Sequence, residues 1–271
     1  MDYKLIAIDM DGTLLNGNGE IIPLVQEAIC LLRQRYQIVL ATGRHHTTVL
    51  PYYQQLDLDT PIICCNGSYL YYPDSEQYRY QSPISKDNVQ FFLDQCQSLD
   101  LIAYVDDRII LKHTHPANYI SKLEQWALTQ PVSIRPKIER VDDLAAELLH
   151  STHVWTFVTE GDPKAIDELI ALEHVQRAFC YEHSWFNRIG FNNIGNSKGQ
   201  LLARYLEELA IPNSQVMAIG DNDNDVSMID VAGLGIALSN ATPKLKARAN
   251  HITQGSNNDS GMLEAFALLT S

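Results

Sequence analysis

The chain has 271 residues, of which 45 % are apolar, and a formal net charge of −13. This length accommodates two domains with full-sized cores, and the composition excludes disordered, fibrous and collagen-like proteins. The acidic charge repels nucleic-acid phosphates and anionic membrane surfaces, so we expect neither nucleic acid nor a membrane as a partner.

The cysteines and the N-terminus predict the compartment. The five cysteines are odd in number, include the adjacent pair Cys64 and Cys65, and form no C-x-x-C motif, which indicates reduced thiols. No apolar run approaches the length of a membrane span, and the first residues lack a secretory signal pattern. We therefore expect a cytoplasmic protein, and the sequence makes no prediction about its oligomeric state.

Short apolar runs alternate with helical spacing in the first part of the chain. The runs cover residues 5–8, 37–41 and 61–65, and a helix is predicted over 24–35, with Pro23 at its first position. The runs are apolar at both alternating positions, which is typical of strands covered on both faces. This alternation of buried strands and helices predicts a doubly wound parallel sheet.

The middle of the chain has a different pattern. Residues 102–105 and 108–111 are separated only by Asp106-Asp107, which predicts a hairpin. A further strand is expected at 154–158, and helices are expected at about 117–129 and 163–172. We interpret this part as an α+β region.

Strands and helices are predicted to alternate again late in the chain, with a helix over 197–209 and a strand over 216–219. The predicted fold is therefore α/β, with a doubly wound, Rossmann-like parallel sheet as the core. We expect residues 1–83 and 188–271 to form the core domain and residues 84–187 to form an inserted α+β cap domain.

Two carboxylates and a turn follow the first predicted strand, in the run Asp9-Met10-Asp11-Gly12-Thr13. Because side-chain direction repeats every two residues in a strand, Asp9 and Asp11 are expected to point the same way. The carboxyl ends of parallel strands are where ligands bind. One carboxylate there can attack phosphorus, and the other can act as general acid and base. A plain Asp-Gly turn is the alternative for this motif in isolation.

Two further segments are candidates for holding a phosphoryl group. Thr42-Gly43-Arg44 follows the second strand, where a hydroxyl and backbone N–H groups can cradle phosphate. Lys198 opens a predicted helix, although a cation at a helix start opposes the macrodipole. A phosphoryl oxygen or the Asp9 carboxylate would explain that placement. In isolation, a helix cap and a solvated lysine are the simpler interpretations.

Acidic and amide side chains cluster after the strand at 216–219, in the run Gly220-Asp221-Asn222-Asp223-Asn224-Asp225. Acidic groups this close repel one another unless a cation lies among them. Oxygen ligands favour a hard ion, and Mg²⁺ bridging carboxylates and phosphate is the natural candidate. An acidic helix N-terminus is the alternative, which we retain for Asp223.

In this order, the four motifs resemble those of the haloacid dehalogenase-like phosphatases. The position of the insertion, between the third strand and Lys198, is similar to that in the Cof-type branch, which carries an α/β cap. Residues 42–46 and 58–67 also resemble the bacterial pyridoxal-phosphate phosphatases of that branch. The likeness covers the whole chain.

The resemblance implies a role for individual residues. Asp9 would be the nucleophile and a metal ligand, Asp11 the acid and base with its backbone carbonyl on the metal, and Asp221 the third protein ligand of Mg²⁺. Asp225 would orient Asp221 or Lys198. Five residues would hold the phosphoryl group: Met10 through its backbone N–H, Thr42, Gly43, Lys198 and Asn224.

The resemblance implies a magnesium-dependent phosphomonoester hydrolase that forms an aspartyl-phosphate and acts on a small phosphorylated metabolite. Arg44, His45 and Asn66, together with the cap, are candidates for recognising the leaving group of the substrate. The alternative for His45 is a histidine on a helix surface that has no role. Pyridoxal 5′-phosphate is the first expected substrate, and flavin mononucleotide and sugar phosphates are alternatives.

Two other functions are compatible with the same core. A phosphotransferase or mutase would return the phosphoryl group to a sugar, and the large cap argues against it. A non-catalytic phosphate-sensing module is disfavoured by the intact nucleophile, acid and lysine.

Overall fold

The structure, a computed structural model, describes residues 2–116 and 119–270. The described residues divide into two compact units. Unit 1 comprises residues up to 43, 52–80 and from 197 onward, and unit 2 comprises residues 44–51 and 81–196. Within the described ranges, no helix has the length and apolarity needed to cross a membrane.

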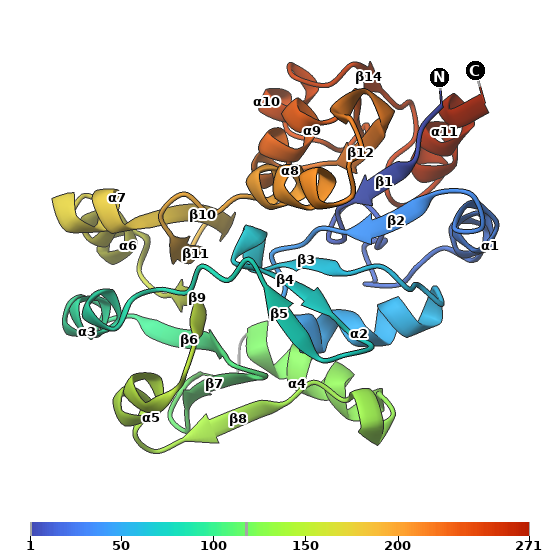
Figure 1. The fold of residues 1–271 in the computed structure, drawn as a ribbon. Helices are drawn as coiled ribbons and strands as arrows, with labels where there is room; N and C mark the ends of the chain where they lie inside the picture. The colour runs from blue at the N-terminus through green and yellow to red at the C-terminus, as the bar shows by residue number, and fades with distance from the viewer. Residues whose placement is uncertain (1, 117–118, 271) are drawn as a thin grey trace. The chain divides into compact units, whose positions relative to one another are not determined.

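Unit 1 is built on a five-stranded parallel sheet with the order β14-β13-β12-β1-β2 (Figure 1). The chain leaves β1 toward β2 on one side and returns to β12 on the other side, so the strand order reverses between β1 and β12. In open parallel sheets, such a reversal opens a crevice at the carboxyl ends of the strands. The strands are β1 (Leu5–Ile8), β2 (Gln37–Leu40), β12 (Val216–Gly220), β13 (Leu234–Ala237) and β14 (His251–Ile252).

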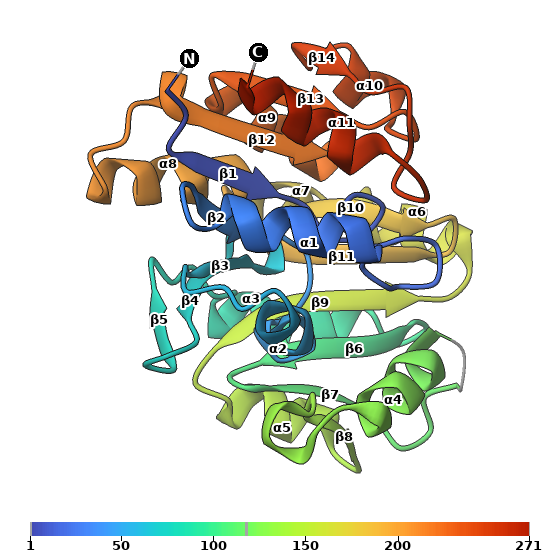
Figure 2. The same cartoon turned by 90° about the vertical axis from the view of Figure 1, so that its right-hand side faces the viewer.

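Helices cover both faces of this sheet. On one face, Leu202, Met228 and Leu245 pack in one cluster with alternate strand residues such as Ala7 and Ala218. These three side chains come from α8 (Lys198–Glu208), α9 (Val226–Val231) and α10 (Pro243–Lys246). Helices α1 (Pro23–Leu32) and α11 (Gly261–Ala267) lie together over the other face (Figure 2). The predicted doubly wound α/β fold is confirmed, as is Pro23 at the first position of its helix.

The third predicted strand joins a separate sheet. Strand β3 (Ile62–Cys64) pairs in antiparallel fashion with β4 (Tyr69–Tyr72), which pairs with β5 (Gln77–Arg79). A single parallel bridge, between Ala41 and Ile63, links this sheet to the end of β2. Helix α2 (His46–Gln55) connects β2 to β3, and it starts in unit 2 and ends in unit 1.

Unit 2 contains a six-stranded sheet with the order β10-β11-β9-β6-β7-β8, in which only β7 and β8 are parallel. The hairpin predicted around Asp106-Asp107 is confirmed as β6 and β7. The strands are β6 (Asp100–Val105), β7 (Arg108–Lys112), β8 (Ile138–Val141), β9 (Val154–Glu160), β10 (Phe179–Trp185) and β11 (Arg188–Asn193).

An apolar core holds the helices of unit 2 to its sheet. Phe92 of α3 stacks on Phe157 of β9 with ring centroids 4.5 Å apart, and Leu148 and Ile166 belong to the same cluster. The predicted helices at 117–129 and 163–172 are confirmed as α4 and α6, although residues 117–118 lie outside the described residues. The helices are α3 (Lys86–Gln95), α4 (Tyr119–Thr129), α5 (Leu144–His150), α6 (Pro163–Ile170) and α7 (Glu173–Ala178).

Short 3₁₀ turns complete the chain: η1 (Cys65–Gly67), η2 (Val132–Ile134), η3 (Asn213–Gln215), η4 (Asp223–Asp225) and η5 (Leu268–Thr270).

Candidate active site

A buried lysine bridges two carboxylates at the point where the strand order of unit 1 reverses. Lys198 Nζ donates to Asp9 Oδ1 at 2.5 Å and to Asp225 Oδ1 at 2.7 Å. Asp9 directly follows β1, and Lys198 is the first residue of α8. Lys198 and Asp225 are fully buried, and Asp9 nearly so. The attraction of two buried carboxylates therefore explains a cation at a helix start, where the macrodipole alone would disfavour it.

Asp225 also organises the turn after β12. Its Oδ2 accepts hydrogen bonds from the backbone N–H groups of Asp221, at 2.9 Å, and Asn222, at 3.0 Å. Both carboxylate oxygens of Asp225 are therefore engaged, one by the lysine and one by the backbone. This matches the supporting role that the sequence suggested for Asp225, because the side chain fixes both Lys198 and the turn that carries Asp221.

The Asp221 carboxylate faces the turn after β1. Its Oδ1 accepts from Thr13 Oγ1 at 2.9 Å, and its Oδ2 accepts from Asn240 Nδ2 at 3.4 Å. Asn240 Nδ2 also donates to the backbone carbonyl of Gly12 at 2.8 Å. Two segments distant in sequence, residues 12–13 and Asn240, thus hold the Asp221 carboxylate against the turn that follows Asp9.

These groups strongly influence one another's ionisation. Burial raises the pKa of Asp9 well above its ordinary value, and the Asp225 carboxylate raises it further. Burial likewise raises the pKa of Asp221 to about 6. Burial alone would lower the pKa of Lys198, but Asp225 and Asp9 together raise it above its usual range. The protein's own cation therefore offsets the three carboxylates only in part.

The same carboxylates fit a hard divalent cation. Asp9, Asp221 and Asp225 offer oxygens that lie within 4.8 Å of one another. Asp9 Oδ2 is buried and has no hydrogen-bond partner among the described residues. Oxygen donors, excess negative charge and an orphaned carboxylate oxygen are the features expected of a Mg²⁺ site. Asp225 Oδ1 is paired with Lys198 and its Oδ2 already accepts two hydrogen bonds, whereas each Asp221 oxygen accepts one and Asp9 Oδ2 accepts none among the described residues. Asp9 and Asp221 are therefore the side chains with the most capacity left to bind the ion.

Several candidate phosphate-binding residues lie in unit 1. Thr42 is buried two residues after the end of β2, and its backbone carbonyl accepts from the Asn66 N–H at 3.0 Å. Asn224 Nδ2 donates to Asn66 Oδ1 at 3.1 Å. A Cβ added at Gly43 would lie 3.2 Å from that same Asn66 oxygen. Asn66 therefore connects the segment after β2 with the turn after β12.

Met10 and Asp11 lie in the turn after β1. Strand β1 ends at Ile8, so the alternation expected to align Asp9 with Asp11 does not extend to Asp11. The Asp9 side chain is buried, whereas Asp11 is exposed. The Met10 backbone N–H donates no hydrogen bond within the described residues, which leaves it available to an anion.

Arg44 and His45 belong to unit 2. Arg44 is half-buried, and His45 is fully buried. Both ring nitrogens of His45 have partners, Nδ1 with Thr47 Oγ1 at 2.9 Å and Nε2 with the Asp106 backbone carbonyl at 3.1 Å. The ring therefore holds the β6–β7 turn, and it is not the helix-surface histidine that the sequence offered as an alternative.

Sequence reasoning missed Thr13 and Asn240 and treated Gly12 only as part of a turn. Thr13 lies within the motif 9–13, so its hydroxyl could have been identified from the sequence as a hydrogen-bond donor at the site. Asn240 had no such clue, because it lies in a polar stretch after β13 and reaches Asp221 only through the fold.

Comparison with known proteins gives a consistent result. The family model for haloacid dehalogenase-like hydrolases matches residues 6–266. The pyridoxal phosphate phosphatase YbhA of Escherichia coli is 35 % identical, over 96 % of this chain and 96 % of that protein. The 5-amino-6-(5-phospho-D-ribitylamino)uracil phosphatase YitU of Bacillus subtilis is 27 % identical, over 94 % of this chain and 93 % of that protein. The structure of a haloacid dehalogenase-like hydrolase from Bacteroides thetaiotaomicron superposes with a TM-score of 0.85 at 25 % identity. The superposition covers 98 % of this chain and 99 % of that one.

Proposed function

Because the chain belongs to the haloacid dehalogenase-like hydrolases and is a phosphatase of that family, we propose that it is a magnesium-dependent phosphomonoester hydrolase with Asp9 as its nucleophile. The main support for this proposal is the environment of the Asp9 carboxylate. One carboxylate oxygen is held by Lys198, and the other is buried without a partner among the described residues. A carboxylate fixed on one side and unsatisfied on the other is oriented for attack on an electrophile.

The reaction has two steps. Asp9 attacks phosphorus, so that an oxygen–phosphorus bond forms while the bond to the leaving oxygen breaks. Asp11 gives its proton to that leaving oxygen, and it then takes a proton from the water that attacks the aspartyl-phosphate. This second attack releases inorganic phosphate and restores Asp9. The exposed position of Asp11 suits a group that exchanges protons with solvent and with a departing product.

The remaining residues neutralise and position charge. Bound Mg²⁺ would supply positive charge that offsets repulsion between the carboxylates and an anionic substrate. The Asp9 and Asp221 carboxylates and the Asp11 backbone carbonyl would hold it, while Asp225 keeps Asp221 and Lys198 in place. The phosphoryl oxygens would be held by five groups: the Met10 N–H, Thr42, Gly43, Lys198 and Asn224.

Pyridoxal 5′-phosphate is the substrate that we propose first. The support is the similarity over nearly the whole chain to a pyridoxal phosphate phosphatase. Flavin mononucleotide and sugar phosphates are second candidates, and the relative that acts on a phosphorylated ribityl compound favours testing them. We further propose that the cap expected at residues 84–187 reads the leaving group together with Arg44 and Asn66. His45 would contribute by holding the β6–β7 turn.

The test is phosphate release from a panel of phosphomonoesters, with Mg²⁺ and with a chelator. The panel comprises pyridoxal 5′-phosphate, flavin mononucleotide, several sugar phosphates and an aryl phosphate. Release that needs Mg²⁺ and is fastest for pyridoxal 5′-phosphate would support both the mechanism and the substrate. Similar rates on many esters would support the mechanism and make the enzyme a broad-range phosphatase.

Two variants make the test specific. Asp9→Asn keeps the size of the side chain and removes the nucleophile, so release should vanish. Asp223→Asn is the matched control, because Asp223 lies in the same acidic turn but is bonded to Thr242 and Lys244. Undiminished release by Asp9→Asn would overturn the covalent mechanism. Transfer of phosphate to a sugar instead of water would assign the chain to the phosphotransferases.

A further inference from the structure

The turn between β3 and β4 of unit 1 has an unusual backbone (Figure 1). Cys65, Asn66 and Gly67 have φ values of +49°, +52° and +90°, so successive residues lie in the left-handed region. Glycine and asparagine tolerate this region, whereas cysteine adopts it rarely. A strained run of this kind persists only where its surroundings hold it, and such runs are concentrated at functional sites.

The backbone of this turn is bonded to the segment that follows β2. The Asn66 N–H donates to the Thr42 carbonyl oxygen at 3.0 Å, and the Thr42 N–H donates to the Ile63 carbonyl oxygen at 2.9 Å. Both backbone groups of Thr42 are therefore bonded to β3 and the turn that follows it. Thr42 and the adjacent Gly43 are among the groups that would hold a phosphoryl group.

The Asn66 side chain contacts a second segment of the site. Its Oδ1 accepts from Asn224 Nδ2 at 3.1 Å, and a Cβ added at Gly43 would lie 3.2 Å from the same oxygen. Asn66 is half-buried, so water competes only in part for this bond. The bond fixes the direction of the Asn224 amide, which would also hold a phosphoryl oxygen.

Gly67 brings the turn against the start of α8. An added Cβ there would lie 2.2 Å from the Ser197 carbonyl oxygen, a backbone atom that can move aside only together with its helix. The Ser197 side chain caps α8 by accepting from the Gln200 N–H at 3.1 Å, and Lys198 is the first residue of the helix. The contact at Gly67 therefore sets how closely the start of α8 approaches the turn.

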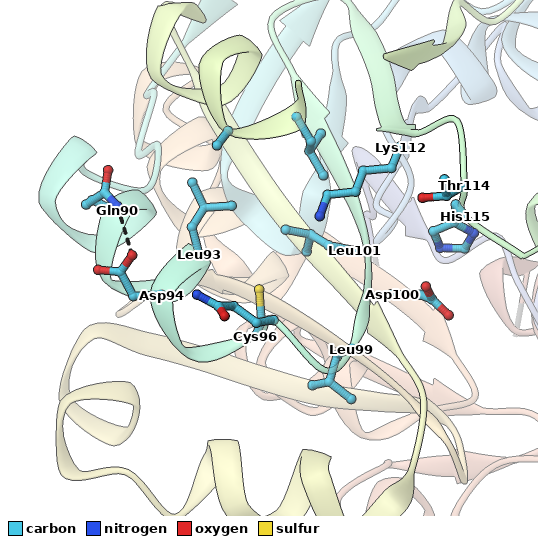
Figure 3. Close-up of a pocket in the computed structure, with 13 residues that line it drawn as sticks. Gln90, Leu93, Asp94, Cys96, Leu99, Asp100, Leu101, Lys112, Thr114 and His115 are labelled. Carbon is cyan, nitrogen blue, oxygen red and sulfur yellow. Dashed lines mark hydrogen bonds between the residues drawn. The ribbon is translucent and has the colours of Figure 1, made fainter. Parts of the chain in front are cut away.

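The polar groups around the hollow beside α3 in unit 2 do not converge in this way (Figure 3). The register of β6 with β7 places Lys112 level with Leu101. Because side-chain direction alternates along a strand, Asp100 points to the opposite face of the sheet. The charges of Lys112 and Asp100 therefore do not meet at one ligand, whereas the turn at 65–67 contacts several segments of one site.

We propose that the turn at 65–67 positions the phosphate-binding groups of the active site, with Asn66 as a positioning residue that acts through Asn224. The inference rests on the proposed phosphatase function and deepens it. Of the groups assigned to the phosphoryl group, all except the Met10 N–H are tied to this turn. The proposed contact of Asn66 with the leaving group is a separate role, because the bond to Asn224 acts on the phosphoryl group that every substrate shares.

The test compares Asn66→Gly with the wild-type enzyme. Glycine tolerates the left-handed backbone and keeps the N–H that donates to Thr42, so only the side chain that holds Asn224 is lost. Isothermal titration calorimetry at saturating Mg²⁺ gives the Kd of inorganic phosphate, and steady-state kinetics gives kcat/KM for each ester of the panel. We expect the Kd to rise by about tenfold and kcat/KM to fall by one common factor for every ester.

Glu76→Gly is the matched control for this substitution. Glu76 also has a positive φ, +51°, and it lies in the next turn of the same sheet, between β4 and β5, with its side chain exposed. Removing this side chain should leave the phosphate Kd and every kcat/KM unchanged.

A double-mutant cycle tests whether Asn66 acts through Asn224. Asn224→Ala removes the amide that the Asn66 side chain orients, so adding Asn66→Gly to it should weaken phosphate binding little further. Additive losses would show that Asn66 acts on phosphate without Asn224, and the positioning role would be wrong.

Gly67→Ala tests the contact with α8 independently. It should displace Ser197 and weaken phosphate binding, whereas Gly195→Ala should not, because Gly195 has a similar φ of +85° and an added Cβ there has no neighbour within 4 Å. Circular dichroism checks the fold of each variant. If Gly67→Ala fails to fold, the comparison of Asn66→Gly with Glu76→Gly decides the question.

An unchanged phosphate Kd in Asn66→Gly would overturn the inference. A changed ranking of the esters without loss of phosphate binding would also overturn it, because that result assigns Asn66 to the leaving group alone. The proposed function is tested by turnover of the wild-type enzyme and the inference by the variants, so the two can fail separately.

Discussion

At Gly12 the backbone has φ +84°, and an added Cβ would lie 2.3 Å from Asp221 Oδ2. Thr13 and Asn240 hold that carboxylate in place, so it cannot move aside without losing those bonds. We expect Gly12→Ala to displace Asp221 and to reduce phosphate release by about 100-fold, since small misplacements of catalytic groups have effects of that size. Steady-state phosphate release at saturating Mg²⁺ measures this.

Gly19→Ala separates the steric effect from backbone strain. Gly19 also has a positive φ, +75°, but an added Cβ there would have only an ordinary contact, 3.9 Å from the Tyr52 hydroxyl. Both variants should lose about 1 kcal/mol of stability from the left-handed backbone. Only Gly12→Ala should lose activity, and equal losses in both variants would contradict the explanation through Asp221.

His45 links stability to pH. The Asp106 carbonyl can only accept, so Nε2 carries the proton and Nδ1 accepts from the Thr47 hydroxyl. Burial lowers the pKa of His45 from 6.5 to about 4, although the Asp106 carbonyl and the Asp107 and Asp106 carboxylates oppose the shift. A lowered folded-state pKa means that the stabilisation is complete above pH 6.5 and is lost as the pH falls toward about 4.

The expected loss at about pH 5 is about 2 kcal/mol for His45. His45→Gln keeps an N–H donor for the Asp106 carbonyl but does not titrate, so its stability should fall less between pH 7 and pH 5. Urea unfolding at both pH values measures the difference. Burial lowers the pKa of His46 in both proteins and His45 lowers it further, so only the burial contribution of His46 is common to the two. An identical fall in both proteins would exclude His45 as the titrating group.

At the scale of elements, the turn between β12 and α9 depends on one buried side chain. Asp225→Ala would remove a partner of Lys198 and leave two backbone N–H groups, those of Asp221 and Asn222, without an acceptor. Breaking a buried ion pair from one side costs about 3–5 kcal/mol. We therefore expect that loss in the free energy of urea unfolding, together with loss of phosphate release.

Asp223→Ala is the comparison for this turn. Asp223 is bonded to the exposed Lys244 and to Thr242, so its removal should cost about 1 kcal/mol or less. If the two substitutions destabilised the protein equally, the buried network around Lys198 would not be the element that holds the turn.

Strands with a continuous apolar pattern were predictable, and strands with polar residues were not. The parallel strands β1, β2 and β12 follow directly from their apolar runs. Strand β11 contains Arg188 and two asparagines, so its pairing with β9 and β10 depends on neighbours that a single segment does not reveal. Strand β3 looked like a further parallel strand, yet its three residues pair mainly with β4, because the tight turn at 65–67 folds the chain back.

At the scale of the whole molecule, the candidate site was likewise predictable only in part. Motif residues such as Asp9, Lys198 and Asp225 were identifiable because four motifs follow one another in a recognisable order, each at the end of a predicted strand or the start of a predicted helix. Asn240 had no such signal, because it reaches Asp221 only through the fold.

The distribution of tryptophans makes it possible to follow the two units separately. All three, at positions 126, 155 and 185, belong to unit 2, whereas Asp9, Asp221 and Lys198 belong to unit 1. A ligand that binds only the folded state stabilises the part that binds it, by about 2.7 kcal/mol at 100 times its Kd. If the units unfold separately, tryptophan fluorescence reports unit 2 alone, and far-UV circular dichroism reports both units.

We therefore expect Mg²⁺ to raise the circular-dichroism transition of unit 1 and to leave the tryptophan-monitored transition in place. Asp221→Asn should abolish the Mg²⁺ effect, because it removes one of the two carboxylates that remain to bind the ion. An equal shift of both transitions by Mg²⁺ would show that the units unfold together, so that binding in one unit stabilises the whole chain.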